Sequence, residues 1–209
     1  MSVEEMDWSE ITKYREGMDI KHIPLIKHNS LSVWELFRPF VKEKSKILDV
    51  GAGKSPYRSE LPRSINYKTL DVDEKIKADY RSFSNILKDS FDGVWMVSVV
   101  EHLTIKQFSD YLKQIIRVLK PGGKLIITTH NIYAIPDLTH YDYSHVQHYP
   151  LADLYGLTKL HGFAMVKVYR VLDNRGWRKL RNPIKRCLCF FLGVDYAWSV
   201  MLVVRKPVG

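Results

Sequence analysis

The chain has 209 residues, a formal net charge of +9 and a composition that is 45% hydrophobic and 26% charged. These values suit one globular domain with a real core. The two cysteines, Cys187 and Cys189, lie two positions apart, which excludes a disulfide framework and favours a reducing, cytoplasmic setting. The first ten residues are acidic and lack an apolar run, so we do not expect a signal peptide there.

Regular elements are predicted from about residue 30 onward. We assign residues 1–30 to an N-terminal helical cap or lid, because they fit the pattern poorly, and residues 31–209 to the core of the same domain. An amphipathic helix comes first, and three strands follow it, the first of which runs into a glycine-rich turn. The helix covers residues 30–41 and the strands cover residues 46–50, 66–72 and 91–100.

The clearest helix is predicted over residues 104–119. Its apolar side chains recur at the spacing of one helical face, namely Ile105, Phe108, Leu112, Ile115, Ile116 and Leu119. Thr104 and Gln107 form a capping box at its start, and Pro121-Gly122-Gly123 stops it.

The remaining elements continue the alternation of strands and helices. A strand over 124–129, a helix over 151–162 and a strand over 163–172 precede a basic helix and a last strand over 199–206. This order predicts an α/β fold with a mostly parallel sheet that helices cover on both faces. The histidine-rich segment over residues 131–150 is too long and polar for a tight turn. Such loops at strand ends often carry function.

Two features near the C-terminus bear on partners. Residues 167–186 contain eight Lys or Arg residues and one acid. They could face nucleic acid, an anionic membrane or a phosphorylated substrate, or form an ordinary solvated face. Nucleic acid is not favoured, because aromatic residues are not interleaved with the basic ones.

The apolar run 187–204 reaches the length of a membrane span, but Gly193 and Asp195 interrupt it. We predict a helix end, a turn and a buried strand, and a peripheral membrane contact stays open.

The stretch ILDVGAGKS, residues 47–55, matches two phosphate-binding patterns only in part. A P-loop would need glycine at position 48, where Leu48 lies inside the strand. A dinucleotide fingerprint would need glycine at position 56, where the chain has Pro56. What remains is Asp49-Val50-Gly51-Ala52-Gly53, a sharp turn whose glycines let a ligand approach the backbone.

Two acids, each closing a strand, indicate a different ligand. Asp49 lies at a carboxyl strand end, where ligands bind in open α/β sheets. A carboxylate there would repel pyrophosphate, but it suits S-adenosylmethionine, which carries an ammonium and a sulfonium. Asp71 closes the next strand, 18 residues past Gly53, and an acid near this spacing can accept hydrogen bonds from both ribose hydroxyls. Asp71 could alternatively be a helix N-cap or turn residue.

Four stretches resemble, in order and at normal spacing, the motifs of class I S-adenosylmethionine-dependent methyltransferases. They are ILDVGAGKSPYR (47–58), YKTLDVD (67–73), FDGVWMVSVVEHL (91–103) and IIRVLKPGGKLIITTHN (115–131). The last two are typical of the subgroup that includes quinone-biosynthesis methyltransferases. HYDYSHVQHYP (140–150) resembles relatives linked to cell-surface sugar pathways, but Ser144-His145 stands where those have an arginine.

The resemblance implies a fold and a cofactor site. The fold is Rossmann-like and doubly wound, with a mostly parallel seven-stranded sheet that ends in an antiparallel hairpin of 163–172 and 199–206. The methionine end of the cofactor would meet Asp49, Gly51, Ala52 and Gly53, and Asp71 would hold the ribose. The other implied contacts are Val72 beside the adenine, Asp79 or Tyr80 at the adenine edge, and Val97 and Ser98 under the methionine portion.

Candidates for a catalytic base lie directly after the strand 124–129 and in the loop that follows it. Methyl transfer from a sulfonium needs alignment rather than a dedicated nucleophile, yet a hydroxyl or amine acceptor benefits from a nearby base. His130, His145 and His148 are our catalytic candidates, and His140 belongs to the same group. These histidines could instead pack among the tyrosines of the loop. Their spacing matches no compact metal motif, so we assign no metal ligands.

The leading hypothesis is a methyltransferase that acts on a small molecule or a glycan precursor. An RNA or other macromolecular acceptor is the alternative, motivated by the basic segment. A catalytically silent, cofactor-binding partner subunit is another, because no residue is unmistakably catalytic. Neither the acceptor nor the oligomeric state follows from the sequence.

Overall fold

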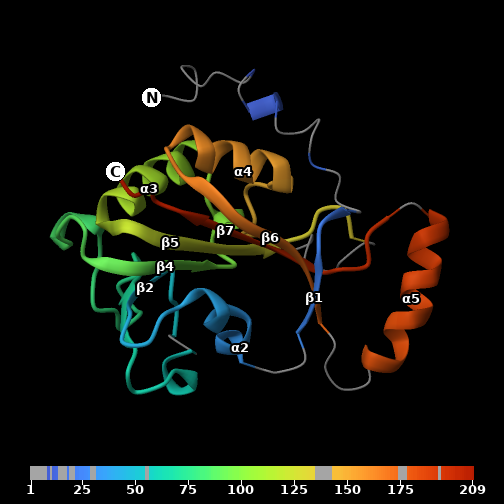
Figure 1. The fold of residues 1–209 in the computed structure, drawn as a ribbon, viewed down its shortest axis with the longest axis horizontal. Coiled ribbons are helices and arrows are strands. Elements are labelled where there is room, and N and C mark those ends of the chain that lie inside the picture. Colours follow the sequence, from blue (N-terminus) through green and yellow to red (C-terminus); the bar gives the residue numbers. More distant parts are fainter. Residues whose placement is uncertain are drawn as a thin grey trace.

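A seven-stranded sheet runs through the centre of the molecule (Figure 1). The computed structural model describes residues 9, 11–13, 18, 22–28, 32–54, 57–134, 143–173, 178–192 and 194–209. The strand order is β1-β6-β7-β5-β4-β2-β3. The strands are β1 (Leu25–His28), β2 (Lys46–Val50), β3 (Asn66–Leu70), β4 (Phe91–Val97), β5 (Leu119–His130), β6 (Ala164–Asp173) and β7 (Ser199–Arg205).

The directions of the strands confirm the predicted architecture. β3, β2, β4 and β5 pair in parallel, whereas β7 pairs antiparallel with both β5 and β6. The fold is therefore α/β, Rossmann-like and doubly wound, with a mostly parallel sheet and an antiparallel pair at its C-terminal end. Because β2 to β5 are parallel, their carboxyl ends meet at one edge of the sheet.

The boundary at residue 30 was wrong, because the sheet begins earlier. Residues 25–28, which we assigned to a helical cap, form the edge strand β1 and pair in parallel with β6. Arg170 fixes this edge: its backbone N–H donates to the carbonyl of Pro24 at 2.8 Å, and its Nε donates to the carbonyl of Ile23 at 2.9 Å. A four-residue, half-buried strand has too few apolar positions to show the alternation that identifies a strand in sequence.

Helices cover both faces of the sheet. The α-helices are α2 (Val33–Phe37), α3 (Ile105–Val118), α4 (Leu151–Leu160) and α5 (Arg178–Leu192). Short 3-10 turns are η3 (Arg38–Phe40), η4 (Arg58–Glu60), η5 (Phe83–Asn85) and η6 (Val100–His102). In Figure 1, α3 and α4 lie on one face, α2 lies on the other, and α5 stands beyond the edge formed by β1.

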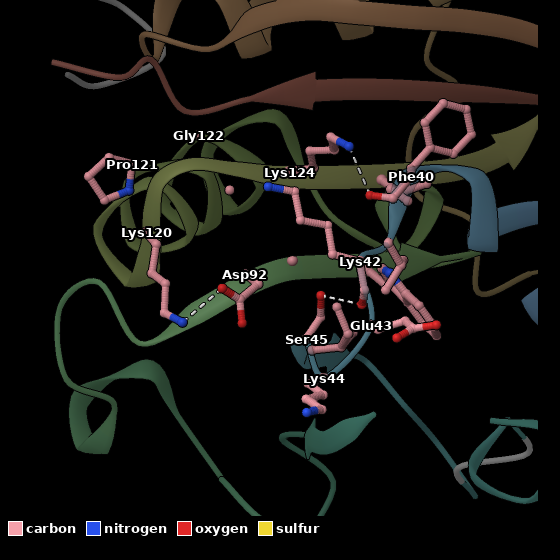
Figure 2. Close-up of a pocket in the computed structure, with 16 residues that line it drawn as sticks. Phe40, Lys42, Glu43, Lys44, Ser45, Asp92, Lys120, Pro121, Gly122 and Lys124 are labelled. Atoms are coloured by element: carbon pink, nitrogen blue, oxygen red, sulfur yellow. Dashed lines mark hydrogen bonds and ion pairs between the residues drawn. The ribbon is translucent and has the colours of Figure 1, made fainter. Parts of the chain in front are cut away.

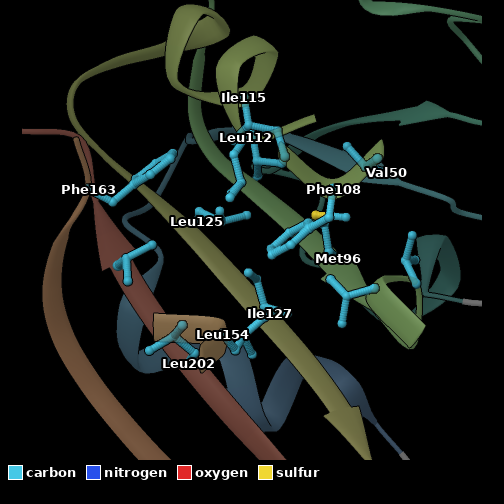
Figure 3. Packing of buried hydrophobic residues seen from close by; sticks show 14 of the residues in the cluster. Val50, Met96, Phe108, Leu112, Ile115, Leu125, Ile127, Leu154, Phe163 and Leu202 are labelled. Carbon is cyan, nitrogen blue, oxygen red and sulfur yellow. The ribbon is translucent and has the colours of Figure 1, made fainter. Parts of the chain in front are cut away.

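Helix α3 forms largely as predicted. The Thr104 hydroxyl accepts from the Gln107 N–H at 3.3 Å, and the Thr104 N–H donates to Gln107 Oε1 at 2.9 Å, which confirms the capping box. Phe108, Leu112 and Ile115 are fully buried against the sheet (Figure 3). The helix ends at Val118, before the Pro-Gly-Gly stretch, because Leu119 already has extended backbone angles and begins β5.

The opposite face is packed by α2, which is shorter than predicted. We predicted one helix over residues 30–41. Residues 33–37 form α2 and residues 38–40 form η3, with Pro39 in the first turn of η3. Phe37 is fully buried and meets the Trp95 ring edge-on, with the ring centroids 4.9 Å apart. Both faces of β2 and β4 are therefore covered, which explains their nearly continuous apolar sequences.

The C-terminal apolar run folds as predicted. Residues 187–192 end α5, Asp195 lies in the connection, and β7 is buried between β5 and β6. None of the helices in the described part of the chain is long and apolar enough to cross a membrane.

Candidate functional site

The glycine-rich turn crosses from β2 toward β3 at the carboxyl edge of the sheet. Gly51 has φ +70, and a Cβ there would lie 2.7 Å from a methyl group of Val99. Gly51 also donates its N–H to the carbonyl of Leu70 at 2.8 Å. Gly53 has φ +51, and Ala52 between them is buried. Both the backbone conformation and the lack of space require glycine at position 51.

Asp49 lies beneath this turn as an almost completely buried acid. Its side chain belongs to β2 and is 1% exposed, and the hydroxyl of Tyr67 donates a hydrogen bond to its Oδ2. Burial raises the pKa of Asp49 to about 7, against the opposing effect of the Tyr67 hydrogen bond, and the negative charge of Asp71 adds to the rise. A cation beside Asp49 would favour its charged form.

Asp71 follows β3 and binds the same turn. Its Oδ2 accepts from the Gly53 N–H at 2.8 Å, and its Oδ1 accepts from the Asp73 N–H at 2.9 Å. A cavity of about 450 Å³ opens here. It is lined by Gly51, Leu70, Asp71, Val72, Ser98, Val99, His102, Leu103, Gln107 and Tyr111. The structure thus brings the glycine turn and Asp71 to one cavity, whereas Asp49 lies buried beneath the turn and is not among the residues that line the cavity.

The other predicted cofactor residues divide between this cavity and its surroundings. Ser98 lines the cavity with φ +52, whereas Val97 packs with the core on the α2 face. Val72 is 67% exposed at the rim. Tyr80 extends the sheet edge by one parallel bridge to Leu70 and packs its half-buried ring against the core.

Asp79 points along β3 and is not among the residues that line the cavity. Its carboxylate accepts from the Thr69 N–H and hydroxyl, each at 3.0 Å, and from Lys68 Nζ at 2.9 Å. Burial opposes its charge, but the hydrogen bonds from Lys68 and Thr69 outweigh burial and hold its pKa below the ordinary value. Asp79 therefore positions the neighbouring Tyr80 against β3.

A cluster of histidines adjoins the cavity on the β5 side. His130 ends β5, and its Nε2 lies 3.5 Å from Glu101 Oε1. The His145 ring lies 5.0 Å from the His130 ring and 4.8 Å from the His102 ring, measured between centroids. His102 lines the cavity that Asp71 also lines, so the cluster reaches this cavity through His102, whereas His130 and His145 are not among its lining residues.

Glu101 holds this cluster, and the sequence reasoning missed it as a site residue. Its side chain is 3% exposed, its Oε2 accepts from the Thr129 hydroxyl at 3.0 Å, and its Oε1 has no hydrogen-bond partner among the described residues. The Glu-His pair in the EHL stretch was the available signal. The contact with His130 joins residues that are distant in the chain and adjacent only because β4 pairs with β5.

The segment after residue 142 is docked onto η6. The Glu101 carbonyl accepts from the N–H groups of Val146 and Gln147 at 2.9 and 3.2 Å, and His102 Nδ1 lies 3.1 Å from the Ser144 carbonyl. His148 is exposed farther along this segment, and His140 lies outside the described residues.

The cluster can bind a proton and has the donor types for a metal ion. Glu101, His102 and His145 each offer one ligand atom, and these atoms lie within 4.8 Å of one another. Imidazole and carboxylate groups suit zinc-like cations. No metal motif is visible in the sequence, because Glu101 and His145 come together only in the fold.

A larger cavity of about 960 Å³ begins two residues after His130. It is lined by Ile132, Tyr133, Ala134, Arg170, Pro183, Arg186, Cys187, Cys189, Phe190, Phe191, Val194, Asp195 and Tyr196. Its walls therefore come from the chain after β5, from β6, and from α5 with the connection that follows it.

A third cavity, of about 330 Å³, lies at the opposite edge of the sheet, where β2, β4 and β5 begin (Figure 2). Lys120 Nζ lies 2.7 Å from Asp92 Oδ1, and Lys124 Nζ donates to the Phe40 carbonyl at 2.9 Å. Its position at the amino ends of the strands separates this cavity from the glycine turn and the histidines.

Comparisons with known proteins identify a family and related folds. A family model described as a methyltransferase domain matches residues 27–168. Among solved structures, a SAM-dependent methyltransferase from Archaeoglobus fulgidus is 16% identical with a TM-score of 0.67, over 83% of this chain and 91% of that chain. The cyclase SpnF is 16% identical with a TM-score of 0.61, over 97% and 94% of the two chains.

A third similar structure is the complex between the Haloferax volcanii Trm112 methyltransferase activator and a methyltransferase. It is 15% identical with a TM-score of 0.59, over 97% of this chain and 98% of that chain. No curated protein sequence matches the chain significantly. Because the matched family model spans well over half of its residues, this chain belongs to the methyltransferase domain family.

Proposed function

We propose that this chain transfers a methyl group from S-adenosylmethionine to a small-molecule or glycan-precursor acceptor. One observation carries the proposal: Asp49 and Asp71, on adjacent parallel strands, flank a glycine turn at a 450 Å³ cavity. When bound, the cofactor supplies a methyl carbon on a sulfonium leaving group. Asp49 would balance its positive charge, and Asp71 would accept from its ribose hydroxyls.

The surrounding residues would complete the cofactor site. Gly51, Ala52 and Gly53 allow close approach of the backbone, and Ser98 lines the same cavity. Val72 and Tyr80 would border the adenine, with Asp79 holding Tyr80 in place through Thr69. Val97 would act only through the position it gives to Ser98.

The histidine cluster would accept the proton that a hydroxyl or amine acceptor loses. We assign the base role first to His130, because buried Glu101 lies against its Nε2 and would stabilise the imidazolium. His145 lies next to His130 and could share the proton, and His148 remains a candidate at the exposed end of the segment. The 960 Å³ cavity that follows His130 would receive the acceptor.

Calorimetry with S-adenosylhomocysteine tests the cofactor site. We expect Asp49→Ala and Asp71→Ala each to weaken binding by roughly tenfold or more, since each removes a charge-assisted contact. Glu43→Ala, an exposed acid at the opposite sheet edge, is the matched control and should bind normally. Wild-type affinity in both aspartate variants would contradict the assignment.

The acceptor and the base need separate experiments. Mass spectrometry of a cell extract incubated with the protein and isotope-labelled cofactor would reveal the methylated compound. With that acceptor, His130→Ala should slow transfer by about a hundredfold if it is the general base. Single replacements of His145 and His148 test the other candidates, and near-normal rates in all three variants would make the histidines structural.

A macromolecular acceptor is the second candidate, favoured by the basic segment 167–186 and by the likeness to a methyltransferase solved with the Trm112 activator. An RNA acceptor predicts binding that weakens steeply with salt. A third hypothesis is that the chain is a catalytically silent partner subunit, which binds the cofactor without transferring its methyl group. The similarity to the cyclase SpnF is compatible with it. Turnover of the cofactor by the purified chain would eliminate it.

A further inference from the structure

Helix α5 is attached to the rest of the protein through its polar side. Among its described side chains, Asn182, Lys185 and Cys189 face the rest of the protein, and they recur at the spacing of one helical face. Asn182 Nδ2 donates to the Asp173 carbonyl at 3.3 Å, and Lys185 Nζ lies 4.5 Å from the centroid of the Trp198 ring. Cys189 is 1% exposed. A surface helix of a soluble protein normally contacts its core through apolar residues instead.

The apolar side chains of α5 face the solvent. Leu180, Ile184 and Leu188 follow one another at four-residue spacing and are 81%, 65% and 55% exposed. Phe190 and Phe191 extend this surface at the end of the helix, where they also line the rim of the 960 Å³ cavity, and they are 82% and 79% exposed. These five side chains form an apolar band: Leu180, Ile184, Leu188 and Phe191 recur at the spacing of the helical face opposite Cys189, and Phe190 borders that face. We call it the α5 band. Exposed apolar surface of this extent marks an interaction site.

The charge of the helix indicates what covers the α5 band. The sequence of α5, RKLRNPIKRCLCFFL, contains five Lys or Arg residues and no acid. Helices that lie in the plane of a membrane surface combine these features: a large apolar face with Leu and Phe, and Lys or Arg on the remaining surface. Anionic lipid headgroups complement the positive charge.

We propose that α5 docks the protein onto an anionic phospholipid surface, with the α5 band inserted between the headgroups. The helix would lie in the plane of the membrane, because 15 residues are too few to span a bilayer. A second copy of the chain fits this surface less well. Pairing two α5 bands would bring two acid-free basic helices side by side, and their charges would repel one another.

Vesicle flotation of the full chain tests this proposal. Phosphatidylcholine vesicles are compared with vesicles of equal parts phosphatidylcholine and phosphatidylglycerol. We expect the anionic vesicles to bind at least roughly tenfold better, and high salt to weaken that binding. Arg186→Gln should reduce binding about fivefold, since each basic residue near an anionic surface contributes about 1 kcal/mol.

Removing apolar surface tests the α5 band itself. Leu188→Ser with Phe191→Ser should lower binding to anionic vesicles by roughly tenfold or more, because several buried methylene groups are lost. Leu87→Ser is the matched control: Leu87 is 79% exposed but lies outside α5, so binding should not change. Circular dichroism and thermal melting verify that each variant is folded.

Three results would overturn the proposal. The first is equal binding to neutral and anionic vesicles, and the second is full binding by the Leu188→Ser and Phe191→Ser variant. The third is a wild-type dimer, seen by light scattering, that this variant loses, which would make the α5 band an interface between copies. None of these readouts depends on methyl transfer or on the bound cofactor.

Discussion

At the scale of single residues, Asp49 is held in a state that disfavours its charge. Its burial raises the pKa to about 7, while Tyr67 supplies only a partly compensating hydrogen bond. The sequence could indicate Asp49 and Asp71, because each directly closes an apolar strand. It could not indicate Tyr67 or Glu101, because their roles depend on which strands are neighbours in the sheet.

The pKa of Asp49 predicts that cofactor affinity depends on pH. S-adenosylhomocysteine keeps the ammonium of the cofactor, and this group binds best when Asp49 is ionised, so affinity should rise with pH and level off above about 7. Between pH 8 and pH 6 we expect S-adenosylhomocysteine to bind roughly tenfold more weakly, as the ionised fraction falls. Calorimetry across this range measures the effect. Asp49→Asn should bind weakly at every pH, and a flat wild-type profile would contradict the prediction.

Asp49 should also lower the free energy of unfolding at high pH. The folded pKa lies above the unfolded value of 3.8, so Asp49 contributes stability below about pH 4 and loses it as pH rises through about 7. At pH 8 we expect Asp49→Asn to raise the free energy of unfolding of the ligand-free protein, by at most about 4 kcal/mol. Urea unfolding at pH 8 and pH 4 measures this. A variant that gains as much stability at pH 4 as at pH 8 would show that charge is not the cause.

At the scale of elements, strong local patterns predicted the structure well and weak ones did not. Helix α3 has both a long apolar face and a capping box, and it forms within one residue of its predicted start. Strand β1 has four residues and depends on Arg170 of β6, so nothing local identifies it. Of the helix predicted over 30–41, only the five residues of α2 form an α-helix, and η3 follows from Arg38.

Helix α3 should derive its stability from packing more than from its cap. Phe108 is fully buried beneath the helix, so Phe108→Ala should cost about 3–5 kcal/mol of the free energy of unfolding. Thr104→Ala removes one capping bond and should cost about 1 kcal/mol. Denaturant unfolding compares both with Lys106→Ala, an exposed control expected within about 0.5 kcal/mol of wild type. Equal losses from Phe108→Ala and Thr104→Ala would refute this ranking.

At the scale of the whole molecule, Asp195 joins the C-terminal part of the sheet. Its carboxylate accepts from Arg170 Nη1 at 3.0 Å and from Asn131 Nδ2 at 2.7 Å, and it also accepts from the N–H groups of Tyr196 and Ala197. This buried network links β6, the end of β5 and the connection into β7. From the sequence, Asp195 only interrupted an apolar run; its partners are supplied by the fold.

Removing the Asp195 carboxylate should therefore strongly lower the free energy of unfolding. Asp195→Ala leaves Arg170, only 14% exposed, without its ion-pair partner and should cost about 3–5 kcal/mol. Asp110→Ala breaks the exposed pair with Lys113 and should cost at most about 1 kcal/mol. Urea unfolding of the two variants gives the comparison, and similar small losses would mean that the buried network contributes little.

The pairing of β1 with β6 has a consequence during synthesis. Leu25 lies opposite Arg170, so β1 leaves the ribosome long before its partner exists. At typical translation speeds the delay is on the order of 10 s. During that time residues 25–28 expose unpaired backbone groups that other chains can join. Nascent chains arrested before residue 170 should therefore need a chaperone more than those arrested after β6 has emerged.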